Sequence, residues 1–214
     1  ERTTNEVEQM LADRRGCRAA YLLHRTGLLS VVLGLPDSVS LNKDIETEIE
    51  LEHGLCTVMA FELLLRSKTS ARSLGESLEP FGAIAKIGRL ACLVSYVSGQ
   101  CMHPNRRKSI STVDHLLQHG LRLKSKDSDD IRLLLETAPV FKGFLERLRS
   151  QPEPKSGLDS FGPHWGPLSR VELGLAMRWA GPLYPAAVHL AVADILVSKL
   201  AAVGEDEHGA GVVL

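Results

Sequence analysis

RRKSISTVDHLLQHGLRLKSKDSDDIRLLL, residues 106–135, places a basic segment between the ends of two predicted helices. Residues 106–126 contain six basic side chains and one acidic side chain, a local charge of +5 in a chain whose net charge is −1. This asymmetry marks the segment as the first place to look for an anionic partner.

Apolar spacing and helix-end residues define the two helices. Val113, Leu116 and Leu117 recur at helical spacing, and Gly120 stands where a left-handed residue ends many helices, so we predict a helix over residues 111–119. Ser125 is expected to cap the next helix, because three aspartates follow in its first turn and favour the positive end of the helix dipole. The residues of this second helix that we expect to face inward are Ile131, Leu134 and Leu135.

The link between the two helices, residues 121–124, has two interpretations. Its cations, held between patterned helices, would present a fixed positive surface to an anion such as a nucleic-acid backbone. Alternatively, the link is a solvated connection with no partner. Composition alone favours the solvated connection.

The composition of the whole chain indicates a soluble, folded, mainly helical protein. Its 214 residues are 44% hydrophobic and 24% charged, which is ordinary for a globular protein and unlike a disordered one. No apolar run approaches the roughly 20 residues of a membrane span. Four widely spaced cysteines suit reduced, buried thiols, and no signal peptide is visible, so we expect an intracellular protein of the cytoplasm, the mitochondria or both.

The remaining pattern predicts further helices in order along the chain. A helix that is apolar nearly all round, residues 55–65, is expected to be buried. The segment 151–168 carries four prolines and three glycines and is expected to be an irregular, flexible connection. Near the N-terminus we predict a helical pattern over 1–14 that resumes over 18–24 and is ended by Gly27, then a short helix or turn at 28–33 and a loop leading into a helix at 37–52. The other predicted helices are 83–97, 140–149, 169–180 and 185–202. A turn is expected at 101–105 and a frayed end at 204–214.

The sequence contains no recognisable catalytic constellation. Cys101, His103, His115 and His119 suggest a zinc site, but their spacing differs from the usual zinc knuckle and we interpret the histidines as surface groups, with no metal. GAIAKIG, residues 82–88, lacks the spacing and the Lys-Ser/Thr pair of a phosphate-binding loop. Trp179 is expected in the core, and Trp165 is expected to anchor the loop around it.

Two segments resemble class II tRNA nucleotidyltransferases, the CCA-adding enzymes. ERTTNEVEQMLADRRGCRAAYLLHRTGLLSVVLGLP, residues 1–36, is similar to the segment that follows their catalytic head. Residues 106–125 resemble a later segment of the eukaryotic branch, in which a lysine-rich turn precedes a valine-led helix and an LKLK or LKLS turn. Residues 170–196 resemble the late helix pair of the family more loosely. The matching positions of the first segment are Glu1, Arg2, Glu6, Met10, Leu11, Gly27 and Leu28.

The resemblance implies an all-α, irregular helical bundle of the body and tail type, which in this family grips tRNA. It implies the end of the neck at 1–36, a helical body at 37–150, the flexible connection at 151–168 and a helical tail at 169–203. Glu1 and Arg2 would be structural residues of the neck motif. The implied phosphate contacts are Arg106, Arg107, Lys108, Lys124 and Lys126, with Arg14, Arg15 and Arg18 as a second group.

The chain departs from the family where catalysis would occur. The GG motif, the paired metal-binding carboxylates and the EDxxR helix are absent from this sequence, so we expect no catalytic residue here. Mg²⁺ with CTP and ATP would belong to a head supplied elsewhere. Glu1 falls within a predicted helix, and we therefore expect the chain to be a piece of a longer protein.

Two alternatives remain open beside this part of a CCA-adding enzyme. One is a headless homologue that serves as a structural RNA-binding or assembly subunit of a ribonucleoprotein particle. The other is a helical protein-interaction module without an RNA partner. The expected partners are tRNA or another structured RNA, together with a catalytic head domain or ribonucleoprotein subunits, and no membrane.

Overall fold

The computed structural model confirms the all-α class and adds one short hairpin. It describes residues 2–13, 15–34, 41–67, 83–102, 108–150 and 167–209. The helices are α1 (Arg2–Ala12), α2 (Gly16–Arg25), α3 (Leu28–Leu33), α4 (Leu41–Arg66), α6 (Ala83–Val94), α7 (Thr112–His115), α8 (Ser125–Ser150), α9 (Pro167–Ala180) and α10 (Tyr184–Gly209), with a π-helical turn η1 (Leu116–Gly120) and a 3₁₀ turn η2 (Gly181–Leu183).

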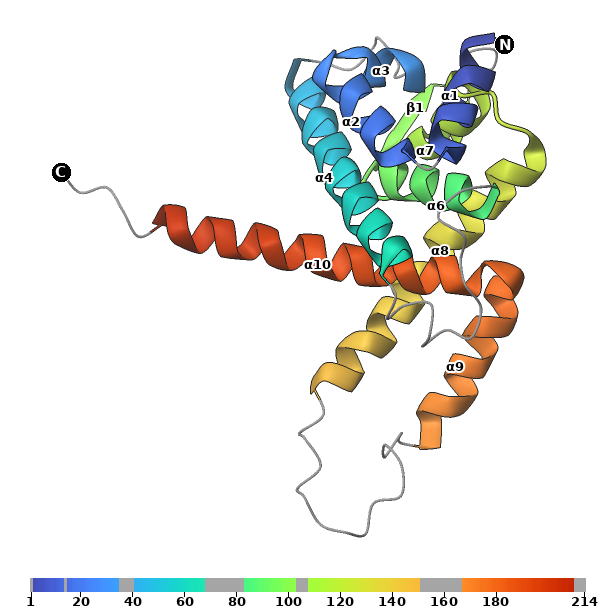
Figure 1. Ribbon diagram of the computed structural model, residues 1–214, viewed down its shortest axis with the longest axis vertical. Coiled ribbons are helices and arrows are strands. Elements are labelled where there is room, and N and C mark those ends of the chain that lie inside the picture. The colour runs from blue at the N-terminus through green and yellow to red at the C-terminus, as the bar shows by residue number, and fades with distance from the viewer. Residues whose placement is uncertain are drawn as a thin grey trace, which may run out of the picture.

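Four helices form the centre of the molecule. α4, α6, α8 and α10 pack against one another, with α1 to α3 and α7 covering the end of the bundle near the N-terminus (Figure 1). α10 crosses the C-terminal end of α4 and continues outward, while α9 and the second half of α8 extend away from the bundle. The central contacts are made by side chains with almost no solvent exposure, among them Val58, Phe61, Leu90, Val94, Ile131, Leu134, Ala187 and Leu190.

A polar network also joins the central helices. The Tyr96 hydroxyl donates a short hydrogen bond to Asp194 of α10, and Lys142 Nζ of α8 lies 2.7 Å from the second oxygen of that carboxylate. Burial of the phenol, together with the hydrogen bond to Asp194, raises the pKa of Tyr96 to about 12. The hydroxyl therefore stays protonated and donating at neutral pH.

The hairpin corrects the turn expected at residues 101–105 for its first two residues, which belong to a strand. β1 (Gln100–Met102) pairs antiparallel with β2 (Ser109–Ser111), with Cys101 opposite Ile110. Residues 103–105 lie outside the described part. β2 leads directly into α7, whose N-cap is Ser111, because its side chain accepts a 3.0 Å hydrogen bond from the Asp114 backbone N–H. The start of the helix predicted over residues 111–119 is therefore confirmed.

Several helices extend beyond their predicted boundaries. α4 begins at Leu41, well before the predicted buried segment 55–65. The helix predicted at 140–149 is the second half of α8, which continues through Pro139 because Ala138 and Phe141, on either side of it, are both buried. α10 is helical to Gly209 and thus extends into residues 204–214, where a frayed end was expected. Residues 210–214 and the connection at 151–166 lie outside the described residues.

One stretch among the described residues, Arg170–Leu200, is long and apolar enough to cross a membrane. It is divided between α9, η2 and α10, and 56% of its most apolar window is buried inside the protein. A core helix of a soluble protein has the same properties, so this stretch carries no argument for a membrane.

Gly120 has a different role from the one predicted. We expected a left-handed helix end, but the left-handed glycines near it are Gly27 (φ 68°) and Gly34 (φ 63°), which flank α3. Gly120 lies in η1 with its Cα against the turn that follows α3. A Cβ at position 120 would overlap the carbonyl oxygen of Leu33. Glycine is needed here for close backbone approach.

A Gly120→Ala variant should therefore be destabilised by about 3 kcal/mol or more, since backbone atoms on both sides of the overlap must move. Gly143→Ala is the matched control, because a Cβ at position 143 of α8 has no heavy atom within 4 Å. That variant should gain roughly 0.5–1 kcal/mol from helix propensity. Urea unfolding at pH 7 measures both, and similar stabilities for the two variants would contradict the assigned contact.

Candidate nucleic-acid interface

The basic link of residues 121–124 is fixed on the protein surface by its own leucines. Leu121 and Leu123 are buried, whereas Arg122 and Lys124 are exposed, so the side chains alternate inward and outward. The Leu121 and Leu123 backbone N–H groups donate to the carbonyl oxygens of Leu116 and Leu117, at 2.8 and 2.9 Å. The link therefore presents its cations from an anchored backbone.

Arg122 has a strained backbone conformation. Its φ of 49° is the one left-handed value among the described non-glycine residues. This conformation costs a residue with a side chain on the order of 1 kcal/mol. The burial of the two leucines on either side holds Arg122 in place. The left-handed residue that ends the preceding helix is thus Arg122, two positions after the predicted Gly120.

Acidic side chains at the start of α8 are engaged by cations of the protein itself. Asp127 Oδ2 accepts a 2.7 Å bond from Lys86 Nζ, and Asp129 accepts a 2.7 Å bond from Arg132. Lys124 and Lys126 are exposed, and neither forms an ion pair with another residue of the described ranges. Asp127 and Asp129 are therefore partly neutralised, whereas Asp130 of the same turn forms no ion pair within the described ranges.

Lys86 of α6 links two other helices. It lies 2.9 Å from Glu8 of α1 and 2.7 Å from Asp127 of α8. Burial of the ammonium group acts to lower its pKa, but the hydrogen bonds to the two carboxylates outweigh this effect, so the pKa of Lys86 lies above its ordinary value. Lys86 is therefore charged at neutral pH and holds the first turn of α8 against the bundle.

Arg89, one helical turn after Lys86, fastens the connection between α1 and α2. It is fully buried, and its guanidinium donates to the Leu11 and Asp13 carbonyl oxygens at 2.5 and 3.0 Å. The same group binds Glu62 of α4 through Nε and Nη2, at 2.9 and 2.7 Å. Arg15 lies at the end of this connection and is exposed, so α6 anchors the segment of Arg15 through Arg89 and the first turn of α8, beside Lys124 and Lys126, through Lys86.

The structure describes only part of the predicted contact set. Lys108, Lys124, Lys126, Arg15 and Arg18 are all exposed, as a phosphate-binding role requires. The remaining predicted contacts, Arg14, Arg106 and Arg107, lie outside the described residues. So, in whole or in their side chains, do the predicted structural residues of the neck motif, Glu1 and Arg2.

The histidines of this region do not form a described metal centre. His115 and His119 pack their rings with centroids 5.5 Å apart, and His115 is buried, which corrects the interpretation of this histidine as a surface group. No group of three or more potential ligands occurs in the described ranges, and His103 falls outside them.

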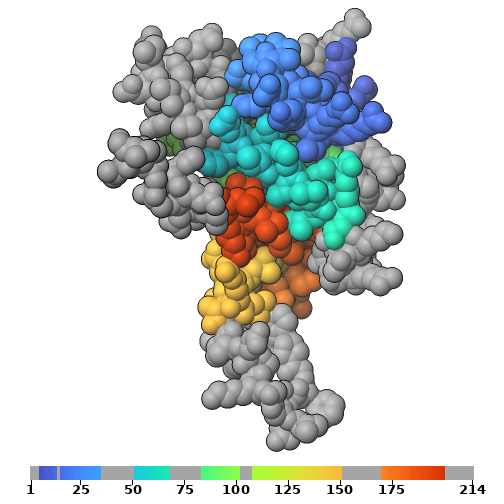
Figure 2. Space-filling view, turned by 60° about the vertical axis from the view of Figure 1, so that its left-hand side comes forward, coloured from blue at the N-terminus to red at the C-terminus, as the bar shows by residue number. Residues whose placement is uncertain are grey.

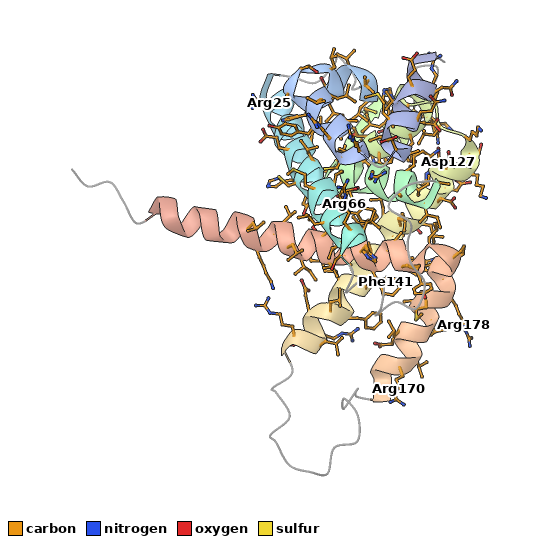
Figure 3. The ribbon with its side chains drawn as sticks, viewed as in Figure 1. Arg25, Arg66, Asp127, Phe141, Arg170 and Arg178 are labelled. Carbon is orange, nitrogen blue, oxygen red and sulfur yellow. The ribbon has the colours of Figure 1, made fainter. Side chains whose placement is uncertain are left out.

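A second cationic surface on α9 was missed from the sequence. Arg170 and Arg178 are exposed on this helix (Figure 3), and Trp179 is 51% exposed, although we had placed it in the core. An exposed indole can stack on a nucleic-acid base. The helical period placed Trp179 beside Ala176 and Ala180, which are buried, so periodicity alone could not separate them. Trp165 lies outside the described residues.

Comparisons with known proteins add no relative. The chain matches no protein-family model, no curated protein and no solved structure.

Proposed function

We propose that the chain is an RNA-binding helical part of a CCA-adding tRNA nucleotidyltransferase, corresponding to the neck end, body and tail. Its role is to hold tRNA while a catalytic head outside this chain adds nucleotides to the 3′ end. The similarity of residues 1–36 and 106–125 to that family supports the proposal, as does the helical architecture.

The observation that carries the proposal is the anchored basic link. Lys124 and Lys126 project from a backbone that buried leucines and Lys86 hold in place, while two of the three neighbouring carboxylates, Asp127 and Asp129, are paired within the protein. Fixed, exposed lysines bind phosphates without paying much conformational entropy in the backbone. The solvated-link interpretation requires no such anchoring.

Charge reversal tests the link directly. The variant Lys124→Glu/Lys126→Glu should bind tRNA about tenfold more weakly or worse near 100 mM salt, because two phosphate contacts become repulsive. The slope of log K against log salt should fall by roughly 1 per lysine. Fluorescence anisotropy with labelled tRNA between about 50 and 200 mM salt measures both quantities.

The matched control is Arg25→Glu/Lys199→Glu, which makes the same change in net charge. Arg25 ends α2 and is well separated from Asp127 of the α8 start, and both control residues are exposed. Equal losses of affinity in the two variants would show a general charge effect and overturn this site. Absence of tRNA binding by the wild-type chain at low salt would instead favour a protein-interaction module.

Trp179 provides an independent test of the surface on α9. Trp179→Ala should weaken tRNA binding by about fivefold or more while leaving the salt slope unchanged, because base stacking carries no counterion release. Leu175→Ala, one turn earlier and 58% exposed, is the control and should bind like the wild type. An unchanged affinity in the tryptophan variant would remove α9 from the interface without affecting the link.

Removing the buried charge of Arg89 tests how this side chain holds α4 and the connection between α1 and α2 together. Arg89→Met should cost roughly 3–5 kcal/mol of stability, because the carboxylate of Glu62 is left buried without its main partner. Arg89→Met/Glu62→Leu should recover much of that loss, since no buried charge remains. Urea unfolding at pH 7 compares the two, and a double variant as unstable as the single one would contradict this account.

A further inference from the structure

One face of α4 leaves an apolar stripe in solvent. Cys56, Met59 and Leu63 are exposed, with 46% of Met59 and 72% of Leu63 accessible. Their spacing of three and four residues aligns them along one side of the helix. The buried side of the helix begins next to this stripe at Leu55 and Val58 and continues round to Leu65 and Phe61, of which Phe61 is nearly opposite Met59. The apolar pattern of residues 55–65 predicted a helix buried on every side. The face of Cys56, Met59 and Leu63 departs from that prediction, because the described chain leaves it exposed.

The stripe ends in opposite charges placed symmetrically about its centre. Glu52 lies seven residues before Met59, and Arg66 lies seven residues after it, so each is about 10.5 Å from the centre along the helix axis. Both are on the same face, with 61% of the Glu52 side chain and 50% of the Arg66 side chain exposed. If the helix is turned end for end about Met59, Arg66 takes the position of Glu52 and Glu52 takes the position of Arg66.

That pattern is complementary to itself in one orientation. Two copies of α4 packed antiparallel would set Glu52 of each chain opposite Arg66 of the other, with Cys56 near Leu63. A parallel pairing would instead align like charges. Self-complementarity of this kind is the requirement of a two-fold symmetric interface.

We infer that the outer face of α4 is a docking surface for a second copy of this chain, with Met59 on the two-fold axis. The face runs across the front of the molecule in Figure 2, with α10 beside it. Existing bonds do not conflict with the pairing. Glu52 contacts His24 at 3.6 Å, and Arg66 Nε donates to Glu62 at 2.8 Å, and a carboxylate or guanidinium makes several such contacts at once.

The dimer should be weak. A single helix face buries less area than a standard protein–protein interface, so the expected dissociation constant is on the order of micromolar. This inference is independent of the proposed role in RNA binding, because α4 carries none of the predicted phosphate contacts.

Disulfide trapping tests the geometry. In a Cys56→Ser background, Met59→Cys should form a covalent dimer under mild oxidation, because a residue on the two-fold axis faces its own copy. Val31→Cys, on α3 and 72% exposed, is the control in the same background and should remain monomeric. The three other cysteines are common to both variants. Equal crosslinking of the two variants, or none in Met59→Cys, would overturn the inference.

Sedimentation velocity tests association without a crosslink. The wild-type chain should show concentration-dependent dimerisation below about 300 µM. Met59→Lys should be monomeric, and Glu52→Lys should weaken the dimer about tenfold by facing Arg66 of the second copy, whereas Val31→Lys should dimerise normally. Circular dichroism checks that each variant is folded. A wild-type chain that stays monomeric throughout this range would show that something other than a second copy covers the face, and would overturn the inference.

Discussion

The arrangement of the N-terminal half depends on the buried guanidinium of Arg89. It donates to Glu62 of α4 and to two carbonyl oxygens in the connection between α1 and α2, so one side chain joins three helices. A buried charge tolerates little displacement, because a lost hydrogen bond no longer offsets the free energy that was needed to remove the charge from water. Lys86 repeats the arrangement one turn earlier with α1 and α8. Together the two cations determine where the basic segments lie relative to the bundle.

Helix positions could be predicted from sequence wherever apolar spacing and end residues agreed. The helix predicted from about residue 111 begins there, Gly27 follows the end of α2 in a left-handed conformation, and Leu116, Leu117, Ile131 and Leu134 are buried. These features depend on neighbours within about four residues, so the local sequence contains them. The basic composition of the link is likewise visible in the sequence.

The errors came from contacts between distant segments. Arg89 binds groups 27 and 78 residues away, and Gly120 is required by the turn after α3, which no local pattern reveals. Pro139 normally indicates a helix end, but burial on both sides keeps α8 continuous. The exposure of Trp179 and of the Met59 face depends on which helices cover them. The anchoring of the candidate interface by α6 could therefore not be predicted from the sequence. The exposed lysines of the interface could be predicted.

The continuity of α8 through Pro139 sets a length scale for any ligand. A helix of 26 residues measures about 39 Å, and it begins beside Lys124 in the body and ends beside α9. A single ligand that contacts both the basic link and the surface of α9 must reach across most of that span. Free nucleotides and very short oligonucleotides would be too small to contact both surfaces at once, because the length of α8 separates them.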